Sequence, residues 1–244
     1  MSLHKVLLLS GAAAFVSSAA LAAEFQNIPT RASALVGFHG VRAPAHPQRA
    51  GEPAGPVLCG TGFGDELPTP DGIISWNDTT GTGYDTGGAA DFTCSVKTKV
   101  KQVWVTGYST SCGKTCTESF NVSFYKNSRA GGSDEPNDGQ VVCAYTGLLG
   151  TTGGGLEGMD LTQLKLRPAC KFKAGRKYWV EVQNNNSDGY HIWYWEYSNT
   201  LQGSRADWVD RNNKFSDGCT ALDNDRYLIG CLDYTYPDYM LELH

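Results

Sequence analysis

Eight cysteines, all of them beyond residue 23, are the feature that most restricts how this 244-residue chain can fold. Residues 1–23 (MSLHKVLLLSGAAAFVSSAALAA) contain one lysine, an apolar core and then small residues that suit a signal-peptidase site. The apolar core is well short of the roughly 20 residues that a membrane-spanning helix needs. We therefore expect a Sec-type signal peptide and a secreted or periplasmic mature chain, whose cysteines oxidise to disulfides.

The sequence does not fix the connectivity of these cysteines, because eight of them allow roughly one hundred pairings. Partners that lie at hairpin tips, strand entries or the two sides of a loop are favoured. Context favours Cys112–Cys116 at a hairpin tip, Cys219–Cys231 around an acidic loop and Cys143–Cys170 between a strand and the entry to another, which leaves Cys59–Cys94 to tie the start of the domain. A zinc site is the rival interpretation of Cys112 and Cys116, but no second Cys or His pair lies at a matching distance. We expect disulfides and no metal here.

Short runs in which apolar and polar residues alternate predict strands after Cys59. The clearest is Ser119–Tyr125, where Phe120, Val122 and Phe124 point one way and the polar residues between them point the other. The full set is Ala90–Val96, Lys99–Tyr108, Ser119–Tyr125, Gln140–Tyr145, Leu161–Leu166, Tyr178–Gln183, Tyr190–Tyr197 and Tyr239–Leu243. Turn residues separate these runs, so we predict an all-β, disulfide-stapled, jelly-roll-like sandwich of two antiparallel sheets.

The chain divides into three parts by composition. After the signal peptide at residues 1–23, residues 24–58 are rich in Ala and Pro and poor in bulky apolar residues, as in a disordered linker or pro-segment. Residues 59–244 form the predicted β-sandwich domain. Loss of Lys5 with the signal peptide changes the formal net charge from −5 to −6. This acidic balance argues against nucleic acid or an anionic membrane as a partner.

A series of short motifs follows in a fixed order between residues 84 and 244. The motifs are Gly87–Thr93, Phe124–Asn127 with Gln140–Val142 after it, Phe172–Val180, Trp208, Lys214–Cys219 and Asp238–Leu243. In this order they resemble a loosely defined group of largely uncharacterised bacterial secreted β-sandwich proteins. The resemblance implies the sandwich fold and export rather than an activity, and Cys112 and Cys116 depart from the group's pattern.

Residues 190–197 (YHIWYWEY) are the most aromatic stretch of the chain. On a strand, Trp193 and Trp195 share one face with His191 and Tyr197, and only one face of a strand enters the core of a two-sheet sandwich. The other face is then either exposed or covered by the long loop that contains Trp208. Exposed rings beside polar groups are typical of surfaces that stack against sugars. The sequence thus predicts a ligand-binding site made of Tyr190, Tyr194, Glu196 and Trp208.

No catalytic motif accompanies these residues. His191 is the one histidine between Cys59 and the terminal His244, and no Gly-x-Ser-x-Gly sequence is present, so a structural role for His191 is favoured. A pair of carboxylates for glycoside cleavage could be drawn from four acidic residues, whose separation the sequence does not give. These are Glu181, Glu196, Asp207 and Asp210.

Two acidic loops invite a calcium interpretation. Residues 134–139 resemble an EF-hand loop but have Tyr145 where the motif needs Glu. Asp217, Asp223 and Asp225 are the better candidates for a hard cation, although solvated turn residues are the favoured interpretation. We therefore expect no cofactor, with Ca²⁺ as the alternative.

Taken together, these features favour an exported, non-enzymatic binding module that recognises carbohydrate or another extracellular surface through aromatic loops. The expected partner is a glycan or cell-surface ligand. One alternative is a small secreted polysaccharide hydrolase or lyase of jelly-roll type, which the shortage of histidine and of catalytic motifs disfavours. The other is a structural or adhesive surface protein.

Overall fold

The computed structural model describes residues 56–60, 72–79, 81, 83–110, 115–129, 132–154, 160–186, 192–198, 201–222, 231 and 238–244. Within these ranges every regular element is a β-strand, as the alternation of apolar residues predicted. The predicted signal peptide, and the predicted linker as far as residue 55, lie outside the described residues. None of the described segments forms a helix long and apolar enough to cross a membrane.

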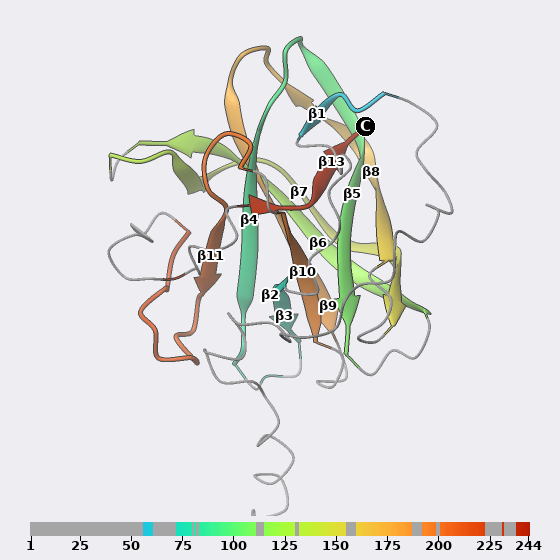
Figure 1. Cartoon of the computed structure of the whole chain (residues 1–244), viewed down its shortest axis with the longest axis vertical. Coiled ribbons are helices and arrows are strands. Elements are labelled where there is room, and N and C mark those ends of the chain that lie inside the picture. Colours follow the sequence, from blue (N-terminus) through green and yellow to red (C-terminus); the bar gives the residue numbers. More distant parts are fainter. Residues whose placement is uncertain are drawn as a thin grey trace, which may run out of the picture.

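The strands form two layers (Figure 1). The first sheet contains, in spatial order, β11 (Asp207–Asp210), β4 (Thr86–Thr93), β9 (Lys177–Asn186), β6 (Thr115–Ser128) and β7 (Glu135–Gly154). All four pairings in this order are antiparallel. The short β3 (Trp76–Asp78) adds to β9 in parallel. Since β9 has neighbours along both edges, its outward side chains lie in the middle of the sheet.

The second sheet is built around β5 (Thr98–Ser109). One edge of β5 pairs with β8 (Asp160–Phe172), and the other pairs with β13 (Leu241–Leu243) and then β10 (Trp193–Ser198). Three short strands complete this sheet: β1 (Cys59–Gly60) pairs with β13, and β2 (Gly72–Ile74) and β12 (Asp238–Tyr239) pair with β10. A short parallel pairing of Tyr108 with Gly153 links the end of β7 to β5, so the two sheets are joined at that corner.

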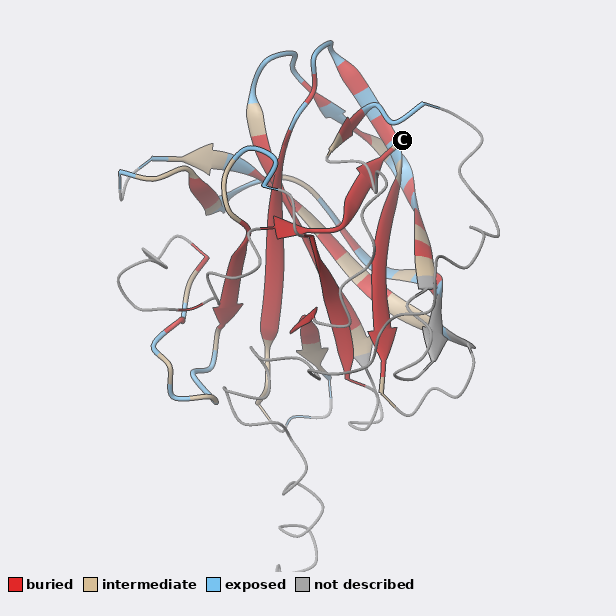
Figure 2. Ribbon diagram, viewed as in Figure 1, coloured by how far each residue is buried: buried red, intermediate tan, exposed pale blue. Residues whose placement is uncertain are grey.

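The core fills the space between the two sheets, where Figure 2 shows mostly buried strands. Phe120, Val122 and Phe124 of β6 all belong to it, which confirms the predicted phase of that strand. Four rings contributed by β4, β6, β8 and β9 pack edge to face, tilted or stacked, with centroid separations from 4.9 to 6.0 Å. These rings are Phe92, Phe124, Phe172 and Tyr178. Aromatic contacts of this geometry stabilise a core beyond the area that they bury.

Three of the four favoured disulfides are confirmed. The Cα atoms are 4.8 Å apart in Cys59–Cys94, 6.1 Å in Cys143–Cys170 and 5.6 Å in Cys219–Cys231. Cys112 and the side chain of Cys116 lie outside the described residues. Cys59–Cys94 ties the start of the domain to the end of β4, and Cys143–Cys170 joins the two sheets through β7 and β8.

Four strands were not predicted, namely β1, β2, β3 and β11. Each contains four residues or fewer, which is too short to display an alternating pattern. The predicted strands were also too short in most cases. β7, for example, covers Glu135–Gly154, whereas the alternation indicated only Gln140–Tyr145.

At Gly107 of β5 any side chain would destabilise the fold, because there is no room for it. A Cβ atom there would lie 2.5 Å from the backbone oxygen of Tyr194 and 2.6 Å from the Trp193 ring. Overpacking of this kind costs about 1–3 kcal/mol or more. We expect Gly107→Ala to lower the melting temperature by roughly 2–4 °C for each kcal/mol lost, measured by thermal unfolding of the oxidised protein.

Gly139→Ala is the matched control, because its Cβ would have only an ordinary 3.5 Å contact with Asn137. It should change the free energy of unfolding by no more than about 0.5 kcal/mol. Equal melting temperatures for the two variants would contradict the close approach of β10 to β5.

Candidate functional site

The predicted aromatic site is not on the surface. Tyr194 is 5 % exposed and Trp208 is 1 % exposed, and Tyr190 lies outside the described residues. Tyr194 stacks on Tyr108 of the neighbouring strand β5, with ring centroids 4.9 Å apart and planes 5° from parallel. The expectation that this face of β10 is open to a ligand is therefore wrong. The face is covered by Tyr108, Ile74 and Trp76, and Phe215, from the segment that follows Trp208, packs against the same cluster.

Trp208 lies within the main core rather than over β10. Its indole N–H donates a hydrogen bond of 2.8 Å to the backbone oxygen of Ile74, and its ring packs near Phe215. This bond ties β11 of the first sheet to β2 of the second. Trp208 is therefore a structural residue in this fold.

Glu196 is fully buried on β10, and neither of its carboxyl oxygens has a hydrogen-bond partner among the described residues. Burial raises the pKa of this carboxyl well above its usual range, because the charged form loses its hydration. Glu196 is thus held in its neutral, protonated form in the interior. It is not a surface ligand for sugar hydroxyls.

The other acidic residues considered for glycoside cleavage are also buried, namely Glu181, Asp207 and Asp210. A glycosidase needs two carboxyl groups that flank an accessible glycosidic bond, and none of the four is accessible. His191, Asp223 and Asp225 lie outside the described residues, so neither the histidine nor the calcium hypothesis is tested. Asp217 accepts a hydrogen bond from the Cys219 N–H. Among the described residues no group of three or more His, Cys, Asp or Glu is placed to hold a metal ion.

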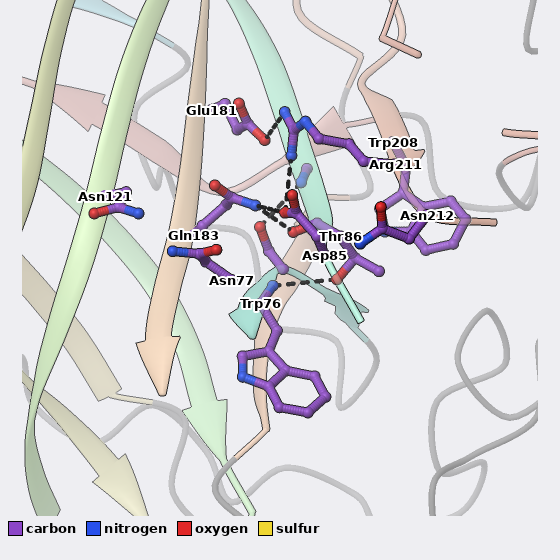
Figure 3. Close-up of polar contacts among 12 residues, drawn as sticks. Trp76, Asn77, Asp85, Thr86, Asn121, Glu181, Gln183, Trp208, Arg211 and Asn212 are labelled. Carbon is purple, nitrogen blue, oxygen red and sulfur yellow. Dashed lines mark hydrogen bonds and ion pairs between the residues drawn. The ribbon is translucent and has the colours of Figure 1, made fainter. Parts of the chain in front are cut away.

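Polar side chains instead gather on the outer side of the first sheet, near the end of β9. Val180 and Val182 of β9 enter the core, so the residues that alternate with them project outward. Neighbouring strands and the segment after β11 add further polar groups beside them, as Figure 3 shows for most of them. We call this set the polar face; it consists of Asn77, Asp85, Asn121, Glu181, Gln183, Asn185 and Arg211.

An ion pair forms the buried part of the polar face. Arg211 donates to Glu181 at 2.7 Å and to Asp85 at 3.3 Å, and the Tyr125 hydroxyl donates to the second oxygen of Glu181 at 2.6 Å. Burial opposes the charge of Arg211, but the two carboxylates outweigh it and raise the pKa of the guanidinium. Burial and the Glu181 carboxylate likewise raise the pKa of Tyr125, so its hydroxyl stays protonated. Glu181 is therefore a fixed acceptor with both oxygens occupied.

Amide side chains form the rest of the polar face; Asn77, Asn121 and Asn185 are partly exposed, whereas Gln183 is buried. Asn121 and Asn185 donate to each other's oxygens at 2.8 and 2.6 Å, and Asn77 donates to Asn185 at 2.6 Å. The Gln183 amide nitrogen donates to Asp85 and to the Thr86 backbone oxygen, both at 2.8 Å. These bonds hold four planar amides in fixed orientations across β3, β6 and β9.

Several polar atoms of this face have no partner among the described residues. The side-chain oxygens of Asn77 and Gln183 accept no hydrogen bond, and Nε of Arg211 donates none. Asn77, Asn121 and Arg211 are partly exposed. The face thus offers both acceptors and donors in a fixed arrangement, which is what recognition of a hydroxyl-rich ligand requires.

Sequence reasoning missed this face, although a signal was present. In Tyr178–Asn186 the residues between the apolar core positions are Glu181, Gln183 and Asn185, all capable of several hydrogen bonds. Three residues of this kind at alternate positions indicate a hydrogen-bonding network on the outer face of the sheet, in contrast to the isolated charges of an ordinary surface. Arg211 and Asp85 gave no signal, because the fold alone brings them to β9.

Comparisons with known proteins do not assign the chain to a family. No protein-family model matches the chain, and no curated protein matches it significantly in sequence.

The first prediction from this region concerns Glu196. Because its pKa is raised, the folded chain holds the proton more tightly than the unfolded chain does, so stability is full below about pH 4.5 and falls as the pH rises toward the folded-state pKa. Glu196→Gln cannot ionise and should remove this loss. We expect its melting temperature to exceed that of the wild type at pH 8 by several degrees, by about 2–4 °C per kcal/mol.

At pH 4 the melting temperatures of Glu196→Gln and the wild type should differ by less than they do at pH 8. Asp138→Asn, which changes an exposed carboxyl group, serves as the control and should follow the wild type at both pH values. If Glu196→Gln destabilises the protein equally at pH 4 and pH 8, Glu196 does not ionise at a raised pKa.

The second prediction concerns Gly87, which leaves room for the Glu181 carboxylate. A Cβ atom at Gly87 would lie 1.8 Å from Oε1 of Glu181, so Gly87→Ala must displace that carboxylate from Arg211. We expect a loss of about 1–3 kcal/mol in the free energy of unfolding. Chemical unfolding of Gly87→Ala, Glu181→Ala and the double variant gives the coupling energy. The cost of Gly87→Ala should largely disappear in the Glu181→Ala background, and additive effects would refute the contact.

Proposed function

We propose that this chain is an exported, non-enzymatic binding module that recognises carbohydrate through the polar face of its first sheet. The observation that carries the proposal is the fixed array of amides beside Arg211, with acceptors and donors left over. A sugar hydroxyl both donates and accepts hydrogen bonds, and an amide offers both functions within one rigid plane. The aromatic strand β10 has no part in this proposal, since its rings are buried.

The network behind the face supports a binding role. Glu181 is fixed by Tyr125 and Arg211, and Gln183 is fixed by Asp85 and Thr86, so the exposed atoms lose little conformational freedom when a ligand binds. Three disulfides, together with the signal-like residues 1–23, support export to an oxidising compartment.

Asn121→Ala tests this proposal, because Asn121 is partly exposed and removing its amide leaves the core unchanged. The secreted protein would be titrated against neutral xylan, β-1,3-glucan, galactomannan and pullulan by affinity electrophoresis. We expect at least one polymer to retard the wild type, with no release of reducing ends. Asn121→Ala should weaken that binding about tenfold, equivalent to about 1.4 kcal/mol.

Thr93→Ala is the control, since Thr93 is exposed at the far end of β4 from Asp85. It should bind like the wild type. Absence of binding to every polymer, or unchanged binding by Asn121→Ala, would reject the polar face as a sugar site. Release of sugar that Glu181→Gln abolishes would establish the hydrolase alternative instead.

A further inference from the structure

A groove of about 460 Å³ lies at the opposite end of β9 from the polar face. Basic side chains from the end of β6, the β8–β9 turn and the start of β9 line it. They are Lys126, Arg129, Lys173, Arg176 and Lys177. Five cations around one hollow are unexpected in a chain whose formal net charge is −5.

Two carboxylates neutralise part of this charge. Asp134 binds Arg129 at 2.6 Å and Lys177 at 2.9 Å, and Asp91 binds Lys177 at 3.1 Å. The Arg129 and Lys177 bonds hold the pKa of Asp134 far below its usual range, so it remains ionised. The Lys177 ammonium group also contacts the Ser204 hydroxyl. Together, the two ion pairs and this contact fix Lys177 at one wall of the groove.

The other three cations have no carboxylate partner among the described residues. Lys126 donates to the amide of Gln140 at 3.2 Å, and Lys173 and Arg176 form no ion pair. All three are exposed. The groove therefore carries an excess of positive charge that no carboxylate of the described part of the chain pairs with.

The excess extends onto the outer face of the second sheet. Residues 161–180 contain six Lys and Arg and no Asp or Glu. Lys171 lies directly opposite Lys99 in the antiparallel pairing of β8 with β5, and both are exposed. Like charges that face each other across two strands destabilise a sheet. An anion bound over the two lysines would therefore reduce a repulsion that is present in the unliganded protein.

We infer that this groove and the adjoining lysines bind an anionic polysaccharide through its sulfate or carboxylate groups. Lys and Arg donate charge-assisted hydrogen bonds to such groups, and a concave basic surface concentrates the field on a chain that enters it. The anion site is independent of the polar face; only the choice of a polysaccharide rests on the proposed function.

The surroundings of the groove disfavour other polyanions. Single-stranded nucleic acid is bound by stacking on aromatic rings, whereas the Tyr178 ring in the groove is buried and its hydroxyl accepts from the Lys173 N–H. A bilayer is approached by a flat or projecting surface with apolar groups to insert. Among the described residues, Val96 is exposed just after β4, and Val141 is exposed opposite Tyr125, next to Lys126; single apolar residues scattered in this way are normal on any surface.

The test uses dextran sulfate and polygalacturonate, with uncharged dextran as the matched neutral polymer. We expect the secreted protein to bind the two charged polymers and not dextran, by titration calorimetry in about 50 mM NaCl. If about three cations engage the polymer, raising NaCl to about 200 mM should weaken binding about 20- to 40-fold. Lys173→Glu should weaken binding about tenfold as well, and Lys214→Glu, an identical charge change at an exposed lysine outside the groove, should have little effect.

Every other outcome counts against the inference. Equal losses in Lys173→Glu and Lys214→Glu would indicate a diffuse charge effect with no groove site. Tighter binding to phosphatidylserine vesicles or to an oligothymidylate than to dextran sulfate would identify a membrane or a nucleic acid as the ligand. Asn121→Ala should leave dextran sulfate binding intact, so a failure of the polar face and a failure of the groove give different results.

Discussion

The stability of the first sheet depends on the ion pair and the hydrogen bond that the Glu181 carboxylate forms. This carboxylate lies in the middle of the sheet's outer face. An isolated buried carboxylate costs several kcal/mol, so Glu181 is tolerated only because Arg211 and Tyr125 occupy both of its oxygens. Arg211 lies beyond the end of β11, so this one residue attaches the edge strand and its loop to the centre of the sheet. The same guanidinium orders Asp85, and through it Gln183, so the orientation of the amides follows from the ion pair.

The two ends of β9 present opposite chemistry. The strand begins at Lys177 in a basic groove and passes, about 20 Å later by strand rise, to Gln183 among neutral amides. The acidic net charge conceals this separation, because the basic residues are concentrated between positions 161 and 180. A single sandwich can thus offer an amide-rich hydrogen-bonding surface and a cationic one without a second domain.

Part of this arrangement was predictable from the sequence. The alternation in Ser119–Tyr125 correctly indicated both the strand and its inward face, and three favoured disulfides were correct, although Cys143 lies inside β7 and not at a strand end. The burial of Tyr194 was not predictable, since Tyr108 covers it from a strand about eighty-six positions away in the chain. Arg211 and Glu181 are thirty positions apart. Contacts of this kind depend on which strands become neighbours, and a period of two residues contains no information about that order.

The central claim is that ligand recognition belongs to the polar face and not to the aromatic strand β10. Side-chain signals in a ¹H–¹⁵N correlation spectrum test it directly during titration with a fragment of whichever neutral polysaccharide binds. The account predicts that the amide signals of Asn77, Asn121 and Gln183 shift, while the indole signals of Trp193, Trp195 and Trp208 stay in place. Shifted indole signals with unchanged amide signals would contradict it.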